Sequence, residues 1–320
     1  MENIKERISR FQWELEGRKL RLGVGCAWVG RGGNSTASMN KDVSLLLKCY
    51  EKGFRYFDTS REYGESERVV GEFLRQIDRK TIFLATKCQY RPPKDPDGNF
   101  LRQPEAFEQF QRLFYESFER LGVDHIDLYQ IHDSESYGIC MDEVIPFLEE
   151  RKKEGMIDYI GMGTRSITAH CQALADGRVD SALSYMDYNL LKLSAEPIIR
   201  LAKEKNAAFI NSSVLLFGLL KEKDPTEKAV GGLGAKRRHY AKELRDLCQR
   251  FNIDSIAASL QFSLLNPDVD MTLNGIKRIS NLESTIQAME NPLYPEQWAA
   301  LFRFQNQCGN IRIPDEANYS

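Results

Sequence analysis

The sequence predicts a (β/α)₈ barrel, because strand-like and helix-like segments alternate along its whole length. Eight short apolar runs have the length of strands, and amphipathic segments lie between them. Glycine or asparagine follows several helical patterns, as at Gly53, Gly122, Gly155 and Asn206, where α-helices usually end. Eight strand–helix pairs without a linker favour one barrel domain over residues 1–320. An open sheet with a second domain is the alternative, and only the count of eight opposes it.

The elements can be placed by their residues. The expected strands are Arg21–Gly25, Arg55–Asp58, Thr81–Thr86, Ile126–Ile131, Tyr159–Gly163, Ser181–Met186, Ala208–Asn211 and Met271–Asn274. The helical patterns lie near Asp42–Lys52, Glu67–Gln76, Phe107–Arg120, Asp142–Lys153, Thr168–Asp176, Ala195–Lys205, His239–Phe251 and Asn281–Glu290. Segment 11–20 is expected to form a hairpin that plugs the bottom of the barrel. The tail, residues 291–320, carries an aromatic helical pattern (WAALFRF) and should pack outside it.

Two long loops follow the third and the seventh expected strands. Loop 89–104 is rich in proline, aspartate and glycine, and loop 221–238 carries GGLG and the basic run KRR. Active sites of such barrels are built from the loops that follow the strands. Both loops are therefore expected on the active face, although individual residues in them can equally be solvent-exposed.

The composition excludes several classes of function. Hydrophobic residues make up 42% and charged residues 28%, an ordinary globular balance. The net charge of −2 gives no electrostatic case for binding nucleic acid or an acidic membrane surface. No apolar stretch approaches the length of a membrane span, and the charged N-terminus lacks the apolar centre of a secretory signal. These features predict a soluble cytoplasmic protein, and none of them specifies an oligomeric state.

Cysteine and histidine usage gives no support for disulfides or metals. The seven cysteines, at positions 26, 49, 88, 140, 171, 248 and 308, are dispersed and include no C-x-x-C pair. This pattern is typical of reduced thiols rather than of a disulfide framework. None of the four histidines is paired at i and i+4, so no metal site is predicted.

Four polar residues stand where short apolar runs end. Asp58 ends RYFD, Lys87 follows TIFLAT, His132 follows IDLYQI, and Tyr63 lies a few residues beyond Asp58. In a barrel, three of these stand at the ends of neighbouring strands, with Tyr63 in the loop after the second strand. Each has an ordinary alternative: a turn cap, a half-buried aromatic, a strand-end charge or a satisfied polar pair. Their joint occurrence on one rim favours a site.

The four side chains suit proton-coupled carbonyl chemistry. A phenol has a pKa of about 10, which a nearby ammonium lowers. A carboxylate beside the lysine would keep the ammonium charged, since an isolated buried ammonium is costly. The imidazole can bind a substrate oxygen or relay a proton. Together they predict an acid/base that serves a carbonyl in one direction and an alcohol in the other.

Ordered motifs carry a resemblance that covers most of the chain. With FDTSREYGESERVVG, IFLATK, SFERLGVDHIDLYQIHD, KEGMIDYIGMG and LNGIKRISNLEST, the sequence resembles the aldo-keto reductase family. The resemblance implies a (β/α)₈ barrel and NAD(P)-dependent interconversion of carbonyls and alcohols. It also implies Tyr63 as general acid/base, Lys87 as the group that lowers its pKa, Asp58 as the partner of the lysine, and His132 as the residue that orients the substrate oxygen.

Three less specific motifs indicate a subgroup within the family. HDSESYG, LSYMDYNLL and FINSSVLLFGLL are similar to the sugar 1-dehydrogenases of the family, of the L-galactose and L-fucose type. The implied reaction is oxidation of an aldose at its anomeric carbon to a lactone. A redox-neutral enzyme that holds its nicotinamide tightly and a non-catalytic, cofactor-sensing regulatory module are the alternatives. A metal-dependent hydrolase is opposed by the few histidines at strand ends.

The segment after the eighth strand has the composition of a phosphate site. Gly275, Lys277 and Arg278 precede a helix that begins near Asn281. Glycine allows close backbone approach, a helix N-terminus offers free N–H groups, and the two cations add charge. The resemblance implies that they hold the 2′-phosphate of NADP. NAD stays open, because Thr285 replaces the asparagine that usually binds adenine in the family.

Other positions depart from the family pattern. Thr164 and Arg165 stand where many members have Ser–Asn against the nicotinamide amide, Tyr185 replaces a glutamine, and Asn211 replaces an aromatic residue. Thr164, Tyr185 and Asn211 remain the expected cofactor contacts at these places. Arg165 is expected either to contact an acidic or phosphorylated substrate or to form an ion pair with a neighbouring loop.

Overall fold

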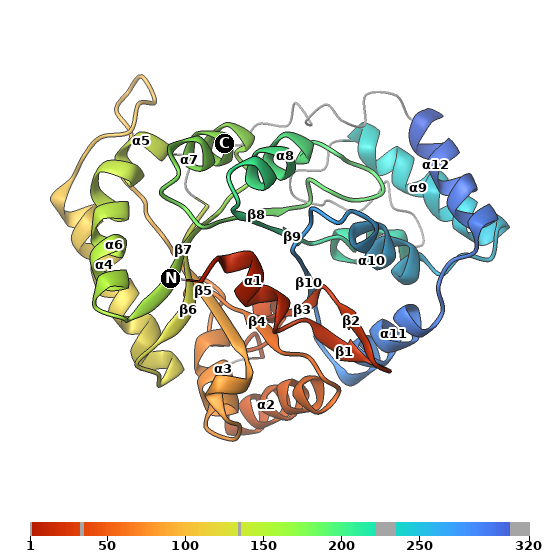
Figure 1. The fold of residues 1–320 in the computed structure, drawn as a ribbon, viewed down its shortest axis with the longest axis horizontal. Coiled ribbons are helices and arrows are strands. Elements are labelled where there is room, and N and C mark those ends of the chain that lie inside the picture. Colours follow the sequence, from red (N-terminus) through yellow and green to blue (C-terminus); the bar gives the residue numbers. More distant parts are fainter. Residues whose placement is uncertain (1, 33–34, 134–135, 222–234, 308–320) are drawn as a thin grey trace.

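Eight parallel strands close into a barrel in the computed structural model of the protein, which describes residues 2–32, 35–133, 136–221 and 235–307 (Figure 1). The strand order is β10-β3-β4-β5-β6-β7-β8-β9. The strands are β3 (Leu22–Gly25), β4 (Tyr56–Asp58), β5 (Phe83–Gln89), β6 (Ile126–His132), β7 (Ile157–Gly163), β8 (Ser181–Tyr185), β9 (Ala208–Ser212) and β10 (Met271–Gly275). The predicted barrel is thus confirmed, and each strand overlaps the segment expected for it.

Helices surround the barrel and follow the strands in turn. They are α2 (Thr36–Glu51), α3 (Ser66–Leu74), α4 (Pro104–Leu121), α6 (Ile145–Lys153), α7 (Ile167–Asp176), α8 (Glu196–Glu204), α10 (Ser255–Leu265) and α11 (Ile279–Glu290). Short helical turns accompany them: η1 (Cys26–Trp28), η2 (Arg79–Thr81), α5 (Tyr137–Ile139), the π-helical η3 (Cys140–Val144) and η4 (Leu216–Lys221). Their ends follow local chemistry: Ser35 caps α2 by accepting from the Ser38 amide, and Gly122 ends α4 with φ of 64°.

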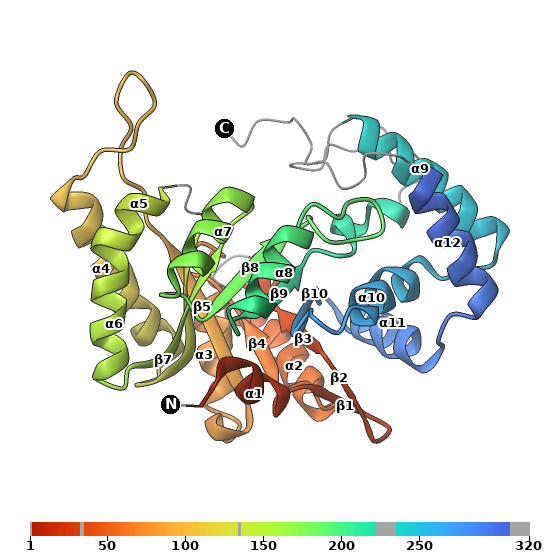
Figure 2. The same ribbon diagram turned by 45° about the horizontal axis from the view of Figure 1, so that its top comes forward.

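The seventh helix of the barrel is not the one expected. The pattern near His239–Phe251 does form a helix, α9 (Ala235–Arg250), but α9 contacts η4 and α12 (Pro295–Gln307). The barrel position before β10 is taken by α10, which contacts both β10 and α11 (Figure 2). Sequence periodicity missed α10 because most of its residues are buried, so it has no polar face. Helix α12 packs outside the barrel, as predicted for the tail.

The bottom of the barrel is closed by a different segment than predicted. The hairpin of β1 (Trp13–Leu15) and β2 (Arg18–Leu20) forms as expected, but α1 (Ile4–Ser9) covers the barrel end (Figure 1). Side chains of α1 and Phe11 join the cluster inside the barrel. The hairpin packs outside instead, where Trp13 stacks on Phe54 with ring centroids 4.3 Å apart. Segment 11–20 therefore contributes one residue to the plug.

Strand alternation divides the core into two layers and decides which residues reach the barrel mouth. Every second residue of a strand points to the barrel axis, and the others face the helices. The inner cluster is Ile4, Ile8, Phe11, Tyr56, Phe83, Ala85, Leu128, Tyr159, Leu183, Ala208, Ile210, Met271 and Leu273. Continuing that alternation upward places Asp58, Lys87 and His132 on the inner side of β4, β5 and β6.

The loop after β5 leaves the barrel on the side where the strands end (Figure 2). Within it, Lys94 and Phe100 form an isolated antiparallel bridge, and Asp95 accepts hydrogen bonds from the Asn99 amide and side chain. Most of loop 221–238 lies outside the described residues. Among the helices that the structure describes, none is long and apolar enough to cross a membrane.

Candidate active site

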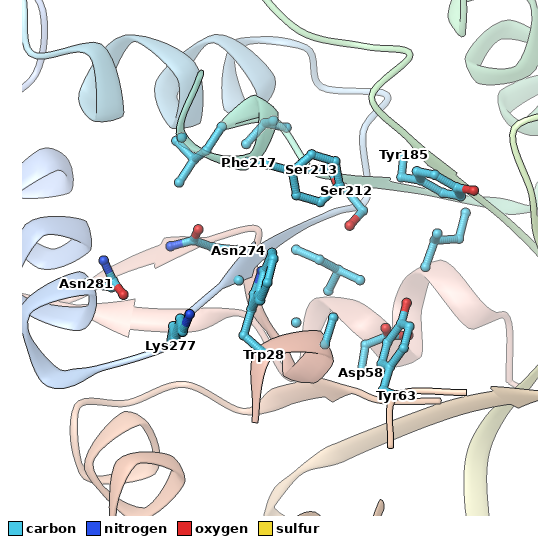
Figure 3. Close-up of a pocket in the computed structure, with 18 of the residues that line it drawn as sticks. Trp28, Asp58, Tyr63, Tyr185, Ser212, Ser213, Phe217, Asn274, Lys277 and Asn281 are labelled. Carbon is cyan, nitrogen blue, oxygen red and sulfur yellow. The ribbon is translucent and has the colours of Figure 1, made fainter. Parts of the chain in front are cut away.

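A cavity of about 880 Å³ opens at the carboxyl ends of the barrel strands. Figure 3 shows Tyr63 and Asp58 at one end, Lys277 and Asn281 at the other, and Trp28 between them. The predicted residues that line it are Asp58, Tyr63, Lys87, His132, Tyr185, Gly275, Lys277, Arg278 and Asn281. The structure therefore brings together nine of the eleven site residues expected from the sequence.

Asp58 and Lys87 form an almost fully buried ion pair in the wall of the cavity. The Lys87 Nζ lies 2.5 Å from Asp58 Oδ1 and donates to the Thr59 carbonyl oxygen at 2.8 Å, while Gln130 Nε2 donates to Asp58 Oδ2 at 3.1 Å. Burial alone would lower the pKa of Lys87, but Asp58, Tyr63 and Glu62 raise it above its usual value. Lys87 is therefore charged. It is not a strand-end residue, since β5 continues to Gln89, which pairs with His132.

Tyr63 is held in place by the backbone of the loop that follows β4. This loop continues along β5: the Thr59 amide donates to the Ala85 oxygen and the Arg61 amide to the Lys87 oxygen, each at 2.9 Å. The phenol ring then lies near three polar groups. Lys87 Nζ is 5.0 Å from the ring centroid, and the Arg31 guanidinium carbon is 5.9 Å from it. The His132 ring meets Tyr63 edge-on, with centroids 5.6 Å apart.

The pKa of Tyr63 differs from the sequence prediction in its net direction. Burial raises the pKa of the phenol, and Asp58 and Asp133 add to this rise. Lys87 acts in the predicted direction, through its charge and a hydrogen bond, but does not outweigh burial. The pKa of Tyr63 therefore lies above that of an ordinary phenol. In this arrangement Tyr63 is protonated at neutral pH and able to donate a proton.

His132 is fixed by a residue that the sequence did not indicate. Glu62 Oε2 lies 3.1 Å from His132 Nδ1 and accepts from Ser60 Oγ at 2.7 Å. Its other oxygen accepts from the Gln89 amide at 2.9 Å. Ser60 Oγ also lies 3.0 Å from His132 Nδ1, so Glu62 and Ser60 together fix the orientation of the imidazole. Burial alone would raise the pKa of Glu62, but these hydrogen bonds hold it below the usual value, so Glu62 is ionised.

On the other side of His132 stands Asp133, the second cavity residue that the sequence did not single out. Its Oδ2 is 3.6 Å from His132 Nε2 and accepts weakly from Gln89 Nε2 at 3.4 Å. Its Oδ1 accepts from the Tyr185 hydroxyl at 3.0 Å. Tyr185, predicted as a cofactor contact, thus lies at the catalytic end of the cavity and is bound to Asp133.

The far end of the cavity combines exposed aromatic rings with cations. Trp28 and Phe217 are 39% and 43% exposed, and their rings meet edge-on with centroids 6.2 Å apart. Lys277 Nζ lies 5.5 Å from the centre of the Trp28 ring. A Cβ on Gly275 would come within 2.8 Å of Trp28 Cδ1, so only glycine fits beside this ring. Thr285 does not line the cavity, since its hydroxyl binds Asn274 and the Asn281 oxygen.

Two predicted contacts, Thr164 and Asn211, are absent from the cavity wall, and so is Arg165. The Thr164 side chain is buried, and its hydroxyl accepts from the Ser166 amide. Asn211 is fully buried behind the strands, where it donates to the Tyr188 oxygen and Ser263 Oγ. Arg165 pairs with the buried Asp187 at 3.2 Å, which is the ion-pair alternative of the two considered. In the described structure, none of the three lines the cavity.

Alternation explains why Asn211 does not line the cavity and which neighbouring residue of β9 does. On β9, Ala208 and Ile210 belong to the inner cluster, so Asn211 must face the helices. The next residue, Ser212, faces inward and lines the cavity together with Ser213 (Figure 3). Counting inward positions along each strand would have found Ser212 from the sequence. Trp28 and Phe217 had no comparable signal, since they lie in the short helical turns η1 and η4 and not in strands.

Comparisons with known proteins found a matching family model and several similar proteins. A model of the aldo/keto reductase family matches residues 21–305. L-galactose dehydrogenase of Arabidopsis thaliana is 29% identical over 257 residues, which are 77% of either chain. D-threo-aldose 1-dehydrogenase of a Pseudomonas species is 27% identical over 306 residues, 88% of this chain and 92% of that one. The solved holo form of aldo-keto reductase AKR11C1 from Bacillus halodurans superimposes with a TM-score of 0.70 at 25% identity, covering 92% of this chain and 95% of that one.

Proposed function

This chain belongs to the aldo/keto reductase family and is an NAD(P)-dependent oxidoreductase, and on that premise we propose that it oxidises a free aldose at C1 to the lactone. The observation that carries the proposal is the convergence of Tyr63, Lys87 and His132 on one cavity. The choice of a sugar is supported by two relatives, an L-galactose dehydrogenase and a D-threo-aldose 1-dehydrogenase.

The cavity fits a nicotinamide dinucleotide as well as a small substrate. Its volume of about 880 Å³ lies near the upper end of the range for ligand sites, about 300–1,000 Å³. The exposed rings of Trp28 and Phe217 offer apolar faces, and Gly275 keeps the wall beside them thin. Lys277 and Arg278 would bind phosphate at the start of α11. When bound, the coenzyme supplies the hydride acceptor for oxidation.

Each residue at the opposite end has a distinct task in the proposed reaction. Tyr63 takes the proton of the C1 hydroxyl as the hydride leaves that carbon, and returns a proton in the reverse direction. Lys87 favours the phenolate form of Tyr63, and Asp58 keeps Lys87 charged and in position. His132 binds the same substrate oxygen and orients it. Oxidation of the aldose thus releases the lactone, one proton and the reduced coenzyme.

The contact between Glu62 and His132 supports the orienting role of the imidazole. Glu62 lies 3.1 Å from Nδ1, which fixes the rotation of the ring and leaves Nε2 for the substrate oxygen. The ring is thereby held where it can contact the oxygen whose proton Tyr63 exchanges.

The proposal is tested by following reduced-nicotinamide absorbance when the protein meets NADP⁺ or NAD⁺ with a panel of free aldoses. We expect a rate that depends on the stereochemistry of the sugar, with lactone as the product. Activity on simple aldehydes with NADPH, and none on any aldose, would replace the sugar dehydrogenase with a reductase of other carbonyls. Cofactor that copurifies with the protein and undergoes no net change in turnover would favour the redox-neutral enzyme.

Substitution Glu62→Gln should lower kcat/KM for aldose oxidation by about 10- to 100-fold, the value of one charge-assisted hydrogen bond. Glu62 uses one oxygen for the Gln89 amide and the other for Ser60 and His132, so an amide cannot satisfy both sets. The measurement is kcat/KM of Glu62→Gln and of a control, Glu72→Gln, which makes the same charge change on the exposed face of α3. Equal rates for Glu62→Gln and wild type would remove Glu62 from the orientation of His132.

The double substitution Lys277→Ala with Arg278→Ala should weaken NADP binding by about 100-fold or more while leaving NAD binding nearly unchanged. Both side chains are exposed at the cavity end, and no described carboxylate forms a salt bridge with either. They are therefore available for the 2′-phosphate that distinguishes the two coenzymes. Titration of protein fluorescence with each coenzyme measures the two Kd values. Equal weakening of both would show that these residues do not read the 2′-phosphate.

A further inference from the structure

Two ionisable carboxyl groups flank the imidazole of His132. Glu62 Oε2 is 3.1 Å from Nδ1 on one side, and Asp133 Oδ2 is 3.6 Å from Nε2 on the other. Both residues line the cavity, and their side chains are 20% and 34% exposed. A substrate oxygen bound to His132 therefore lies beside these two carboxyl groups as well.

Apart from His132, neutral groups satisfy these carboxyl groups. Asp133 accepts from the Tyr185 hydroxyl and Gln89 Nε2, and Glu62 accepts from Ser60 Oγ and the Gln89 amide. Among the residues that the structure describes, no lysine or arginine forms a salt bridge with either one. Within the described residues, neither carboxyl group is therefore neutralised by a salt bridge with a lysine or an arginine.

Two of the nearby cations are engaged elsewhere. Lys87 is paired with Asp58 at 2.5 Å, and both are almost fully buried. Arg165 is paired with the buried Asp187 and does not line the cavity. Arg31 does line the cavity, with its guanidinium carbon 5.9 Å from the centre of the Tyr63 ring, but it forms no salt bridge with Glu62 or Asp133 in the described part of the chain. A negatively charged substituent next to Asp133 would thus meet repulsion from that carboxyl group, with neither Lys87 nor Arg165 to offset it.

The position of Asp133 is determined by the barrel rather than by a loose loop. Its amide donates to the Gly163 oxygen at 2.7 Å, which extends the pairing of β6 with β7 by one residue. Its φ of 48° is unusual for a residue other than glycine. This backbone conformation, together with the Tyr185 hydroxyl, holds the carboxyl group at the cavity wall.

We propose that Asp133, assisted by Glu62, selects neutral polyhydroxy substrates and excludes sugar acids and sugar phosphates, so that Asp133 is a specificity-determining residue. This inference rests on the proposed function. Carboxylates are strong acceptors for hydroxyl donors, so a vicinal hydroxyl of the sugar satisfies Asp133. A phosphate or carboxylate in the same place has no hydrogen to donate and is repelled. The cationic end at Lys277 and Arg278 binds the 2′-phosphate of the coenzyme instead.

The test compares kcat/KM of the wild-type enzyme for the best aldose of the panel, for its 6-phosphate and for the corresponding uronic acid. We expect the two anionic sugars to react about 10- to 100-fold less efficiently than the neutral one. In Asp133→Asn the ratio should shift toward the anionic sugars by about tenfold. Asp97→Asn, on the exposed loop after β5, changes the same net charge outside the cavity and should leave the ratio unchanged.

A second variant separates charge from structure. Tyr185→Phe removes the hydroxyl that holds Asp133 but keeps the carboxyl group, so discrimination against anions should persist even if rates fall. The proposal is overturned if the wild type prefers either anionic sugar, or if Asp133→Asn lowers all three substrates by the same factor. If no aldose reacts, reduction of benzaldehyde against 4-carboxybenzaldehyde measures the same discrimination. In that case the proposal of a sugar substrate fails, but the comparison of the two aldehydes still tests whether Asp133 discriminates against anions.

Discussion

Replacing Tyr63 with phenylalanine should lower the rate of turnover by about 10²- to 10⁴-fold, the usual contribution of a positioned acid or base. The substitution removes one oxygen and leaves the ring against His132. Lys87 keeps its bonds to Asp58 and the Thr59 oxygen, so the buried charge remains satisfied. We therefore expect unchanged folding and unchanged coenzyme binding, measured by fluorescence titration, beside the loss of kcat in the aldose assay.

Two further measurements make this result specific to proton transfer. In the wild type, burial raises the pKa of Tyr63 above the ordinary value, and only the phenolate accepts a proton. The rate of oxidation should therefore rise with pH up to that pKa, whereas the rate of reduction should be highest below it. The matched variant Tyr50→Phe loses a hydroxyl bound to Thr81 outside the cavity and should keep normal activity. Substantial turnover in Tyr63→Phe would assign the proton to another group.

The fold was predictable because its signals are local and repeated. Each strand of the barrel is a short apolar run, and each turn between elements has its own residues, such as Gly122 after α4. Errors arose where burial removes the pattern. Helix α10 is buried around most of its surface and therefore lacks a polar face. Helix α1 buries Ile4 and Ile8 on one face, but its six residues are too few for a clear periodic pattern.

The sequence located some residues of the candidate site and misplaced others, and the difference lies in which side of the strand each residue occupies. Asp58 and His132 stand on inward positions at the ends of β4 and β6, so the end of an apolar run locates them. Asn211 ends an apolar run too, but it stands on an outward position and faces α10 through Ser263. The position of a polar residue within the two-residue alternation, and not only its place at the end of a run, decides whether it reaches the cavity.

Charge and hydrogen bonding between distant residues were beyond sequence reasoning. Glu62 looks like an ordinary loop carboxylate in the sequence, yet it meets His132, seventy positions away, because the β4 loop runs along β5. The net direction of the pKa shift at Tyr63 could not be predicted from the sequence either. It depends on how far burial outweighs the charge of Lys87, and burial is known only once the loop is folded.

Removing either partner of the Asp58–Lys87 pair should destabilise the protein by about 3–5 kcal/mol, because a buried charge is left without its counter-ion. Both side chains are nearly inaccessible, at 4% and 1% exposure, and Nζ and Oδ1 are 2.5 Å apart. Asp58→Leu leaves the lysine with only the Thr59 oxygen as a partner. Lys87→Met leaves the carboxylate with only the Gln130 amide. Urea unfolding of each variant measures the free energy of unfolding, and the aldose assay measures turnover, which both variants should lack.

The double variant shows whether the ion pair matters for the stability of the fold or for catalysis. Asp58→Leu with Lys87→Met removes both charges, so the double variant should lose less stability than the sum of the singles, since apolar replacement of a buried pair is often neutral. A residual cost of about 1–3 kcal/mol is expected, because the Gln130 amide and the Thr59 oxygen lose their partners. Additive losses would mean that the two charges do not depend on each other. A stable but inactive double variant would show that the barrel keeps this pair for the acid/base chemistry of Tyr63 rather than for folding, whereas recovered turnover would exclude Lys87 from catalysis.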